Sequence, residues 1–149
     1  MTLHDRYQAL SKARQRALHM ELAERAERRW RTHVESEKLE SYVESVVGTF
    51  QKLDWTLPAD AIDVVRRGVD DKDVKGRYVE PIVSMQDDDL CFEPPFEFAY
   101  YCVYNLFCFY LDGQKDDWLI VNQGIAGFGS TPDQIAAIFE TMLTELEAS

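Results

Sequence analysis

The sequence predicts a mainly α-helical bundle that forms a single domain over residues 1–149. The alternative is an α+β fold, in which one segment forms a small β-hairpin. Apolar residues recur at intervals of three and four along much of the chain, which is the spacing of one helix face. Proline and glycine lie where helices are expected to begin and end. The length is typical of one domain, and a hydrophobic content of 46% is enough for a core.

The N-terminal region, about residues 3–53, is predicted to be helical. Thr2 can cap a first helix, with Asp5 in the first turn, where an acid interacts favourably with the helix dipole. Two apolar stripes follow on different faces: Leu3, Tyr7, Leu10, Ala17 and Leu18, then Met20, Ala23, Ala26, Trp30 and Val34. We therefore expect either a break near residue 20 or one helix with different neighbours along its length. Ser36 is expected to cap the next helix, with a core face of Leu39, Tyr42, Val43, Val46, Phe50 and Leu53.

The middle of the chain combines one short helix with an irregular acidic segment. Pro58 is expected to open the helix and Gly68 to end it, with Ile62 and Val65 facing the core. The segment of about residues 69–95 contains three prolines and shows no sustained periodicity of apolar residues. The sequence DKDVKG in this segment resembles the start of an EF-hand loop, but its twelfth position lacks the carboxylate that calcium requires.

The most apolar stretch, FEFAYYCVYNLFCFYLDG, is too short to cross a membrane. Pro95 suits the first turn of a helix and Gly113 the position after its end. The expected helical face is Phe96, Tyr100, Val103, Phe107 and Tyr110. A β-hairpin is the alternative, in which LFCFYL pairs with WLIV across DGQKDD. In the helical interpretation, Asp116 or Asp117 caps a further short helix.

A C-terminal helix is predicted over about 131–147. Thr131 is the expected cap, Pro132 takes the first helical position, and Gln134 completes a capping box. The predicted buried face consists of Ile135, Ile138, Phe139, Met142 and Leu146.

Residue patterns typical of catalysis or metal binding are weak. His4, His19 and His33 would lie about 20 Å apart along one helix, too far to share a metal. Cys91, Cys102 and Cys108 lack metal-ligand spacing and are expected to be buried thiols. The sequence GIAGFGST precedes a helix start, where backbone amides can hold a phosphate, but its order is GxxGxG and no lysine follows, so a turn is expected. We expect no cofactor, no metal and no enzymatic activity, with a small enzyme kept as an alternative.

Charge is unevenly distributed along the chain, whose net charge is −11. Residues 1–35 contain eight Lys/Arg and five Asp/Glu, whereas residues 36–149 contain eight Lys/Arg and twenty-two Asp/Glu. Such a field repels nucleic acid and most membranes, and it attracts a basic protein. The N-terminus has no apolar stretch typical of a secretory signal, so we expect a cytoplasmic protein.

Aromatic and acidic residues concentrate in one part of the sequence. Nine of the eighteen aromatic residues fall between Phe92 and Tyr110, with acids on either side. Aromatic anchors surrounded by charge are typical of protein interfaces, although aromatic residues also build cores. The predicted partner-binding acids are Asp87, Asp88, Asp89, Glu93, Glu97, Asp112, Asp116 and Asp117. The predicted apolar anchors are Phe92, Phe96 and Tyr100.

The stretch YCVYNLFCFYLDGQKDDWLIVNQ, from Tyr101 to Gln123, resembles small bacterial immunity proteins of contact-dependent growth inhibition (CDI) systems. The resemblance implies a cytoplasmic protein that binds the C-terminal toxin domain of a cognate CDI effector and blocks its active site. Many such toxins are nucleases, often basic, and an acidic surface can mimic the phosphates that they bind. A non-catalytic adaptor or oligomeric protein that docks through its basic N-terminal region remains the alternative.

Overall fold

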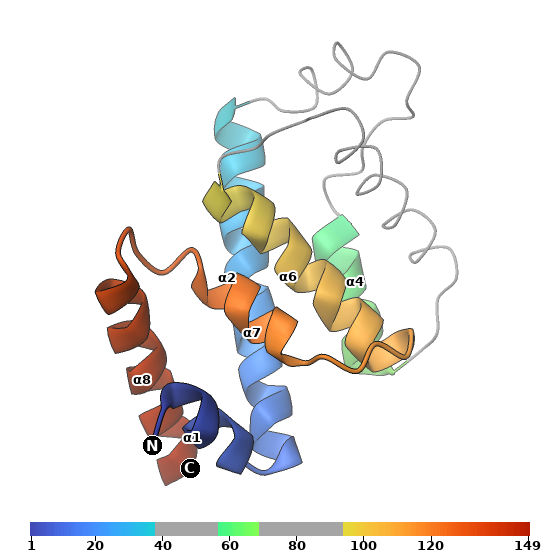
Figure 1. Ribbon diagram of the computed structural model, residues 1–149. Coiled ribbons are helices and arrows are strands. Elements are labelled where there is room, and N and C mark those ends of the chain that lie inside the picture. Colours follow the sequence, from blue (N-terminus) through green and yellow to red (C-terminus); the bar gives the residue numbers. More distant parts are fainter. Residues whose placement is uncertain (38–56, 69–93) are drawn as a thin grey trace.

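The computed structural model describes residues 1–37, 57–68 and 94–149. These residues form six helices and no strand, so the mainly α prediction is confirmed. The helices, numbered as in Figure 1, are α1 (Leu3–Ala9), α2 (Lys12–Glu37), α4 (Leu57–Arg67), α6 (Pro94–Leu111), α7 (Trp118–Ile125) and α8 (Pro132–Ala148). No helix in this part of the chain is both long and apolar enough to cross a membrane.

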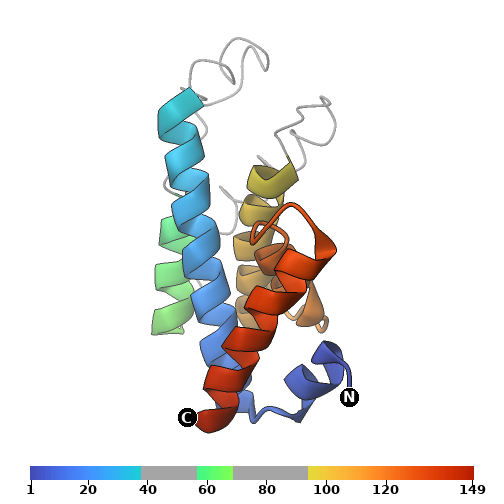
Figure 2. The same ribbon diagram turned by 90° about the vertical axis from the view of Figure 1, so that its left-hand side faces the viewer.

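Helices α2 and α6 form the centre of the bundle and pack against each other (Figure 1). Helix α4 contacts both of them, and α7 contacts both as well. Helix α8 packs on α1 and α2, and both chain termini lie at the same end of the molecule (Figures 1 and 2). The largest fully buried side chains come from five of the helices and include Trp30, Tyr7, Phe107, Phe139 and Leu18.

The first two helices separate at Leu10 and Ser11 rather than near residue 20. Thr2 caps α1 as predicted, with its hydroxyl accepting from the Asp5 amide at 3.0 Å. The Asp5 carboxylate accepts from the Thr2 amide in return, which completes a capping box that was not predicted. Leu10 leaves the helical conformation, and the Ser11 hydroxyl accepts from the Arg14 amide at the start of α2. His4 and His19 therefore lie on separate helices, and the expectation of one continuous helix was wrong.

Helix α2 is continuous through the point where the apolar stripe changes face. It contacts α6, α7, α4 and α8, so the change of stripe reflects a change of neighbours, as the second alternative predicted. Ser36 lies inside α2 and is not a cap, because the helix runs on to Glu37. The helix predicted over Leu39–Leu53 lies outside the described residues.

Helix α6 takes the place of the alternative hairpin. Its buried residues occupy several faces, because α2, α4 and α7 all pack against it; they include Ala99, Cys102, Val103, Leu106 and Phe107. The helix ends at Leu111, and Gly113, two residues further on, has a φ of 76°, a conformation that favours glycine. The amides of Asp112 and Gln114 both donate to the Cys108 carbonyl, which satisfies the helix end.

Helices α4 and α8 match the sequence predictions with one correction. In α4, Ile62 and Val65 are buried, and Gly68 follows the last turn with a φ of 67°. Thr131 and Gln134 form the predicted capping box of α8. Ile138, however, is 37% exposed, and Leu143 is buried in its place. A helix that contacts the bundle along one side buries a narrow stripe, and Ile138 falls at its edge.

Candidate functional site

The predicted partner-binding set is only partly described by the structure. Asp87, Asp88, Asp89, Phe92 and Glu93 lie outside the described residues. Phe96 and Glu97 belong to the first turns of α6, but their side chains are also outside the described set. The acid-rich patch at residues 87–89 therefore stays a prediction.

Tyr100 lies in the core and not on the surface. Its side chain is 2% exposed, and its ring centroid lies 4.8 Å from that of Trp30 in α2. Tyr100 therefore holds α6 against α2 and does not serve as a surface anchor. Among the side chains that the structure describes near this end of α6, Phe98 is an exposed aromatic residue, at 38%.

Asp112 and Asp116 are exposed on the short connection between α6 and α7. Hydrogen bonds hold this connection at several points. The Gln114 side-chain amide donates to Asn105 Oδ1 at 3.0 Å, and Asp116 Oδ1 accepts from the Trp118 amide at 3.1 Å. The capping role predicted for Asp116 or Asp117 thus falls to the side chain of Asp116. Asp112 and Asp116 are therefore exposed on a connection whose conformation is fixed by hydrogen bonds.

Asp117 takes part in a buried polar chain. Tyr7 Oη donates to Asp117 Oδ2 at 2.6 Å, and Tyr7 Oη also lies 2.6 Å from His19 Nε2. His19 Nδ1 lies 2.7 Å from Tyr110 Oη. One arrangement of protons satisfies all three contacts: Tyr110 donates to Nδ1, Nε2–H donates to Tyr7, and Tyr7 donates to Asp117. This arrangement assigns a neutral His19 with its proton on Nε2.

Burial controls the protonation of this chain. It lowers the pKa of His19 from its usual value of 6.5 to about 4, opposed by the nearby carboxylate of Asp117. It also raises the pKa of Tyr7, and the hydrogen bond to Asp117 raises that pKa further. His19 is 1% exposed and tyrosine hydroxyls occupy both of its ring nitrogens. The ring is therefore suited to joining helices rather than to accepting a proton from a substrate.

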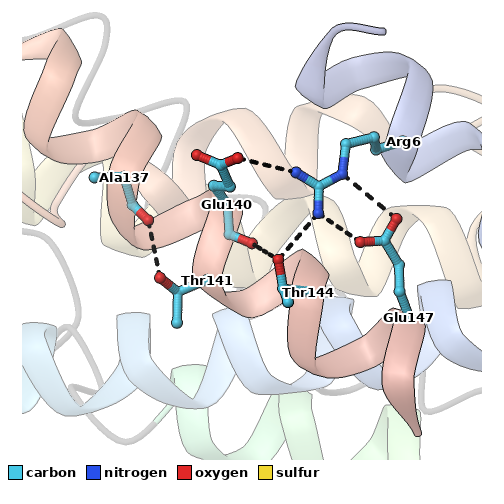
Figure 3. A network of polar contacts seen from close by, with 6 residues as sticks. All are labelled: Arg6, Ala137, Glu140, Thr141, Thr144 and Glu147. Atoms are coloured by element: carbon cyan, nitrogen blue, oxygen red, sulfur yellow. Dashed lines mark hydrogen bonds and ion pairs between the residues drawn. The ribbon is translucent and has the colours of Figure 1, made fainter.

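A second polar cluster joins the two ends of the chain (Figure 3). Arg6 in α1 contacts Glu147 at 2.5 Å, Glu140 at 3.3 Å and the Thr144 hydroxyl at 3.1 Å, all in α8. Hydrogen bonding to Arg6 lowers the pKa of the Glu147 carboxyl. The sequence analysis did not identify this contact, because nothing in a single sequence relates residue 6 to residue 147.

Helix α8 is an acidic surface that the sequence analysis also missed. It contains four acids and no lysine or arginine. Arg6 contacts two of these acids, whereas Asp133 and Glu145 are exposed elsewhere on the helix. The sequence did contain a signal for this acidic surface, because the 17 residues of α8 include no lysine or arginine.

The described cysteines are structural. Cys102 and Cys108 are buried, as predicted, and Cys102 Sγ lies 3.4 Å from the Ile120 carbonyl. Burial raises the pKa of the Cys102 thiol to about 12, which keeps it protonated and unreactive. Among the residues that the structure describes, no group of three His, Cys, Asp or Glu side chains could hold a metal ion.

No protein-family model matches this chain, and no curated protein or solved structure shows significant similarity to it.

Proposed function

We propose that this protein is an immunity protein that binds and neutralises the toxin domain of a cognate CDI effector, most simply a basic nuclease. The observation that carries the proposal is the pair of exposed acids, Asp112 and Asp116, on a hydrogen-bonded connection between two core helices. The same connection lies within the stretch that resembles CDI immunity proteins.

An ordered acidic connection suits an inhibitor for two reasons. Two of its backbone amides already donate to the Cys108 carbonyl, and the Gln114 side chain donates to Asn105, so little conformational entropy is lost when a partner binds. The net charge of −11 attracts a basic partner over a distance comparable to the Debye length, which accelerates association. Lys115 lies between the two acids, so the local charge is smaller than the acids alone suggest.

The proposed mechanism is stoichiometric occlusion without catalysis. Exposed carboxylates would occupy positions that the toxin uses for phosphates, and apolar residues beside them would exclude water. Phe98 is exposed on α6 and is available for that second role.

The test compares two double charge reversals with the same change in net charge. Asp112→Lys/Asp116→Lys alters the connection, and Asp133→Lys/Glu145→Lys alters exposed positions on α8. Stopped-flow mixing with the toxin domain would give association and dissociation rates at several salt concentrations. We expect both variants to associate more slowly at low salt, and only the first to dissociate faster. Equal dissociation rates would remove the connection from the interface.

The competing function is an adaptor that docks through the N-terminal region. Helices α1 and α2 contribute Tyr7, Leu18, Leu22 and Trp30 to the core. Deletion of residues 1–35 would therefore unfold the protein. Substitution of exposed residues, such as Arg28 and Arg31, tests this alternative without that complication.

A further inference from the structure

A basic hollow lies between α2 and the connection from α7 to α8. Its volume is about 400 Å³, and it is lined by Arg25, Arg28, Arg29, Thr32 and Phe128. The three arginines recur at intervals of three and four, so they share one face of α2. A cluster of three guanidinium groups is a local exception in a chain of net charge −11.

The acids of this part of α2 compensate only part of the positive charge. Glu21 pairs with Arg25 at 2.9 Å, and Glu27 pairs with Arg31 at 3.3 Å. Glu24 is engaged by Arg66 of α4. Among the residues whose side chains the structure describes, 1–32, 58–68 and 98–149, neither Arg28 nor Arg29 has a carboxylate partner. The three arginines and the one neighbouring carboxylate, Glu21, therefore give the hollow a net charge of about +2, which matches the charge of a dianion.

Arg29 is held in place by the backbone of the connection. Its Nη2 donates to the Gly124 carbonyl at 3.0 Å. The Gly127 backbone lies so close that an added Cβ would be 2.5 Å from Arg29 Nε. That Nε is buried and finds no hydrogen-bond acceptor in the described part of the protein. A guanidinium fixed in this way is already oriented for an anion before the anion binds.

The other polar groups around the hollow are already engaged. The amides of Ser130 and Thr131 donate to Gln134 Oε1, and the Phe128 amide donates to the Ile125 carbonyl. The Thr32 hydroxyl donates to the Arg28 carbonyl. The glycine-rich connection therefore forms a turn, as predicted, and does not offer these amides to a phosphate. The arginine side chains that line the hollow remain available to a ligand.

The ring of Phe128 orders two of these arginines. It lies 5.6 Å from Arg25 Cζ and 5.9 Å from Arg29 Cζ, within the range of cation–π interactions. The ring also forms an apolar wall of the hollow. Arginine pairs bidentately with phosphate oxygens, and its planar donors match them better than lysine does.

We propose that this hollow binds a phosphate dianion, as inorganic phosphate or the terminal group of a small phosphate monoester. A nucleic acid offers one negative charge per phosphate and is repelled by the rest of the surface, so a small molecule fits better. The proposal does not depend on the immunity function, because it concerns the isolated protein.

The test is an NMR titration of the full chain with sodium phosphate, at ionic strength held constant with sodium chloride. The Arg29 Nε–H and Phe128 amide resonances report on the hollow, and exposed Arg28→Gln is the principal variant. We expect saturable shifts that Arg28→Gln weakens by about tenfold or more, since it removes a charged hydrogen bond. Arg31→Gln on the same helix is the matched control and should leave the affinity unchanged.

Three results would overturn the proposal. One is the absence of saturation with phosphate, and another is an equal loss of affinity in Arg28→Gln and Arg31→Gln. The third is an equal response to sodium acetate, which would indicate a general preference for anions. A titration with glycerol phosphate separates the two sources: tighter binding than inorganic phosphate assigns a monoester, and weaker binding assigns the free ion.

Discussion

His19 Nε2 lies 2.6 Å from the hydroxyl oxygen of Tyr7, and this contact joins α2 to α1 inside the protein. Tyr110 of α6 occupies the other ring nitrogen, and Asp117 at the start of α7 accepts from Tyr7. Four helices therefore meet at one buried imidazole.

Replacing Tyr7 with phenylalanine removes the hydroxyl between His19 and Asp117. The buried Nε2–H then loses its acceptor, which destabilises a fold by roughly 1–3 kcal/mol. Urea unfolding followed by circular dichroism measures the loss. A double-mutant cycle with His19→Leu isolates the contact, because the loss should shrink once the imidazole is gone. A Tyr7→Phe protein as stable as the parent would show that the hydrogen bond contributes nothing.

Protonation of His19 should make stability fall between pH 6.5 and about 4. Its pKa in the folded protein is about 4, below the usual 6.5, so in this window the unfolded chain binds a proton that the folded chain does not. Stability should therefore be highest above pH 6.5 and decrease by about 3 kcal/mol as the pH falls to 4. Denaturant unfolding at a series of pH values measures this slope.

The control for this pH series is His19→Gln, which carries no titrating ring. Its stability should change much less between pH 6.5 and 4, even if it is lower throughout. Carboxyls such as Glu147, whose pKa is lowered in the fold, would contribute at more acidic pH in both proteins. The same slope in parent and variant would assign the pH dependence to other groups.

Replacing Arg6 with glutamine should loosen the attachment of α1 to α8. Arg6 contacts Glu140, Glu147 and Thr144, whereas few other contacts join these helices. We expect faster amide hydrogen exchange in α1 and the last turns of α8, and a smaller difference at high salt. Arg31→Gln, which breaks an ion pair within α2, should leave exchange in α1 unchanged. Unaltered exchange in Arg6→Gln would contradict the role given to the cluster.

Replacing Gly124 with alanine should destabilise the protein despite the better helix propensity of alanine. Propensity alone favours alanine by about 1 kcal/mol. The new Cβ would lie 3.0 Å from Leu22 Cβ and 3.1 Å from Cys102 Sγ, so α7 would have to move from α2 and α6. We expect a net loss of roughly 1–2 kcal/mol in urea unfolding. Asn122→Ala, at an exposed position of the same helix, is the control and should not lower the free energy of unfolding. A Gly124→Ala protein that is more stable than the parent would contradict the close packing of α7 against α2 and α6.

The sequence predicted most of the described helices because their signals are local. The caps at Thr2 and Thr131 and the glycines at 68 and 113 act within one or two turns, and the structure confirms both caps and a positive φ at both glycines. The break at Leu10 was missed because the apolar stripe from Leu3 to Leu18 keeps helical spacing on both sides of Ser11. The all-round apolar pattern of α6 was ambiguous until three neighbouring helices were seen to pack on it.

The candidate site was harder to predict, because tertiary contacts decide which side chains reach the surface. Tyr100 and Phe98 have similar neighbours in the sequence, yet Tyr100 is buried and Phe98 is exposed. Likewise, Asp117 accepts a hydrogen bond from the buried Tyr7, whereas the adjacent Asp116 is exposed. The arginines of α2 could have been noticed from their spacing alone. Their relation to the glycine-rich connection depends on how α7 and α8 fold back on α2.

The most direct test of the immunity proposal is a growth assay. The C-terminal domain encoded by a large effector gene adjacent to this one would be expressed in a bacterial host, alone and together with this protein. The proposal predicts that the domain arrests growth and that this protein restores it, whereas an unrelated protein of similar negative charge does not. Continued arrest in cells that contain the folded protein, or equal rescue by the unrelated acidic protein, would contradict it.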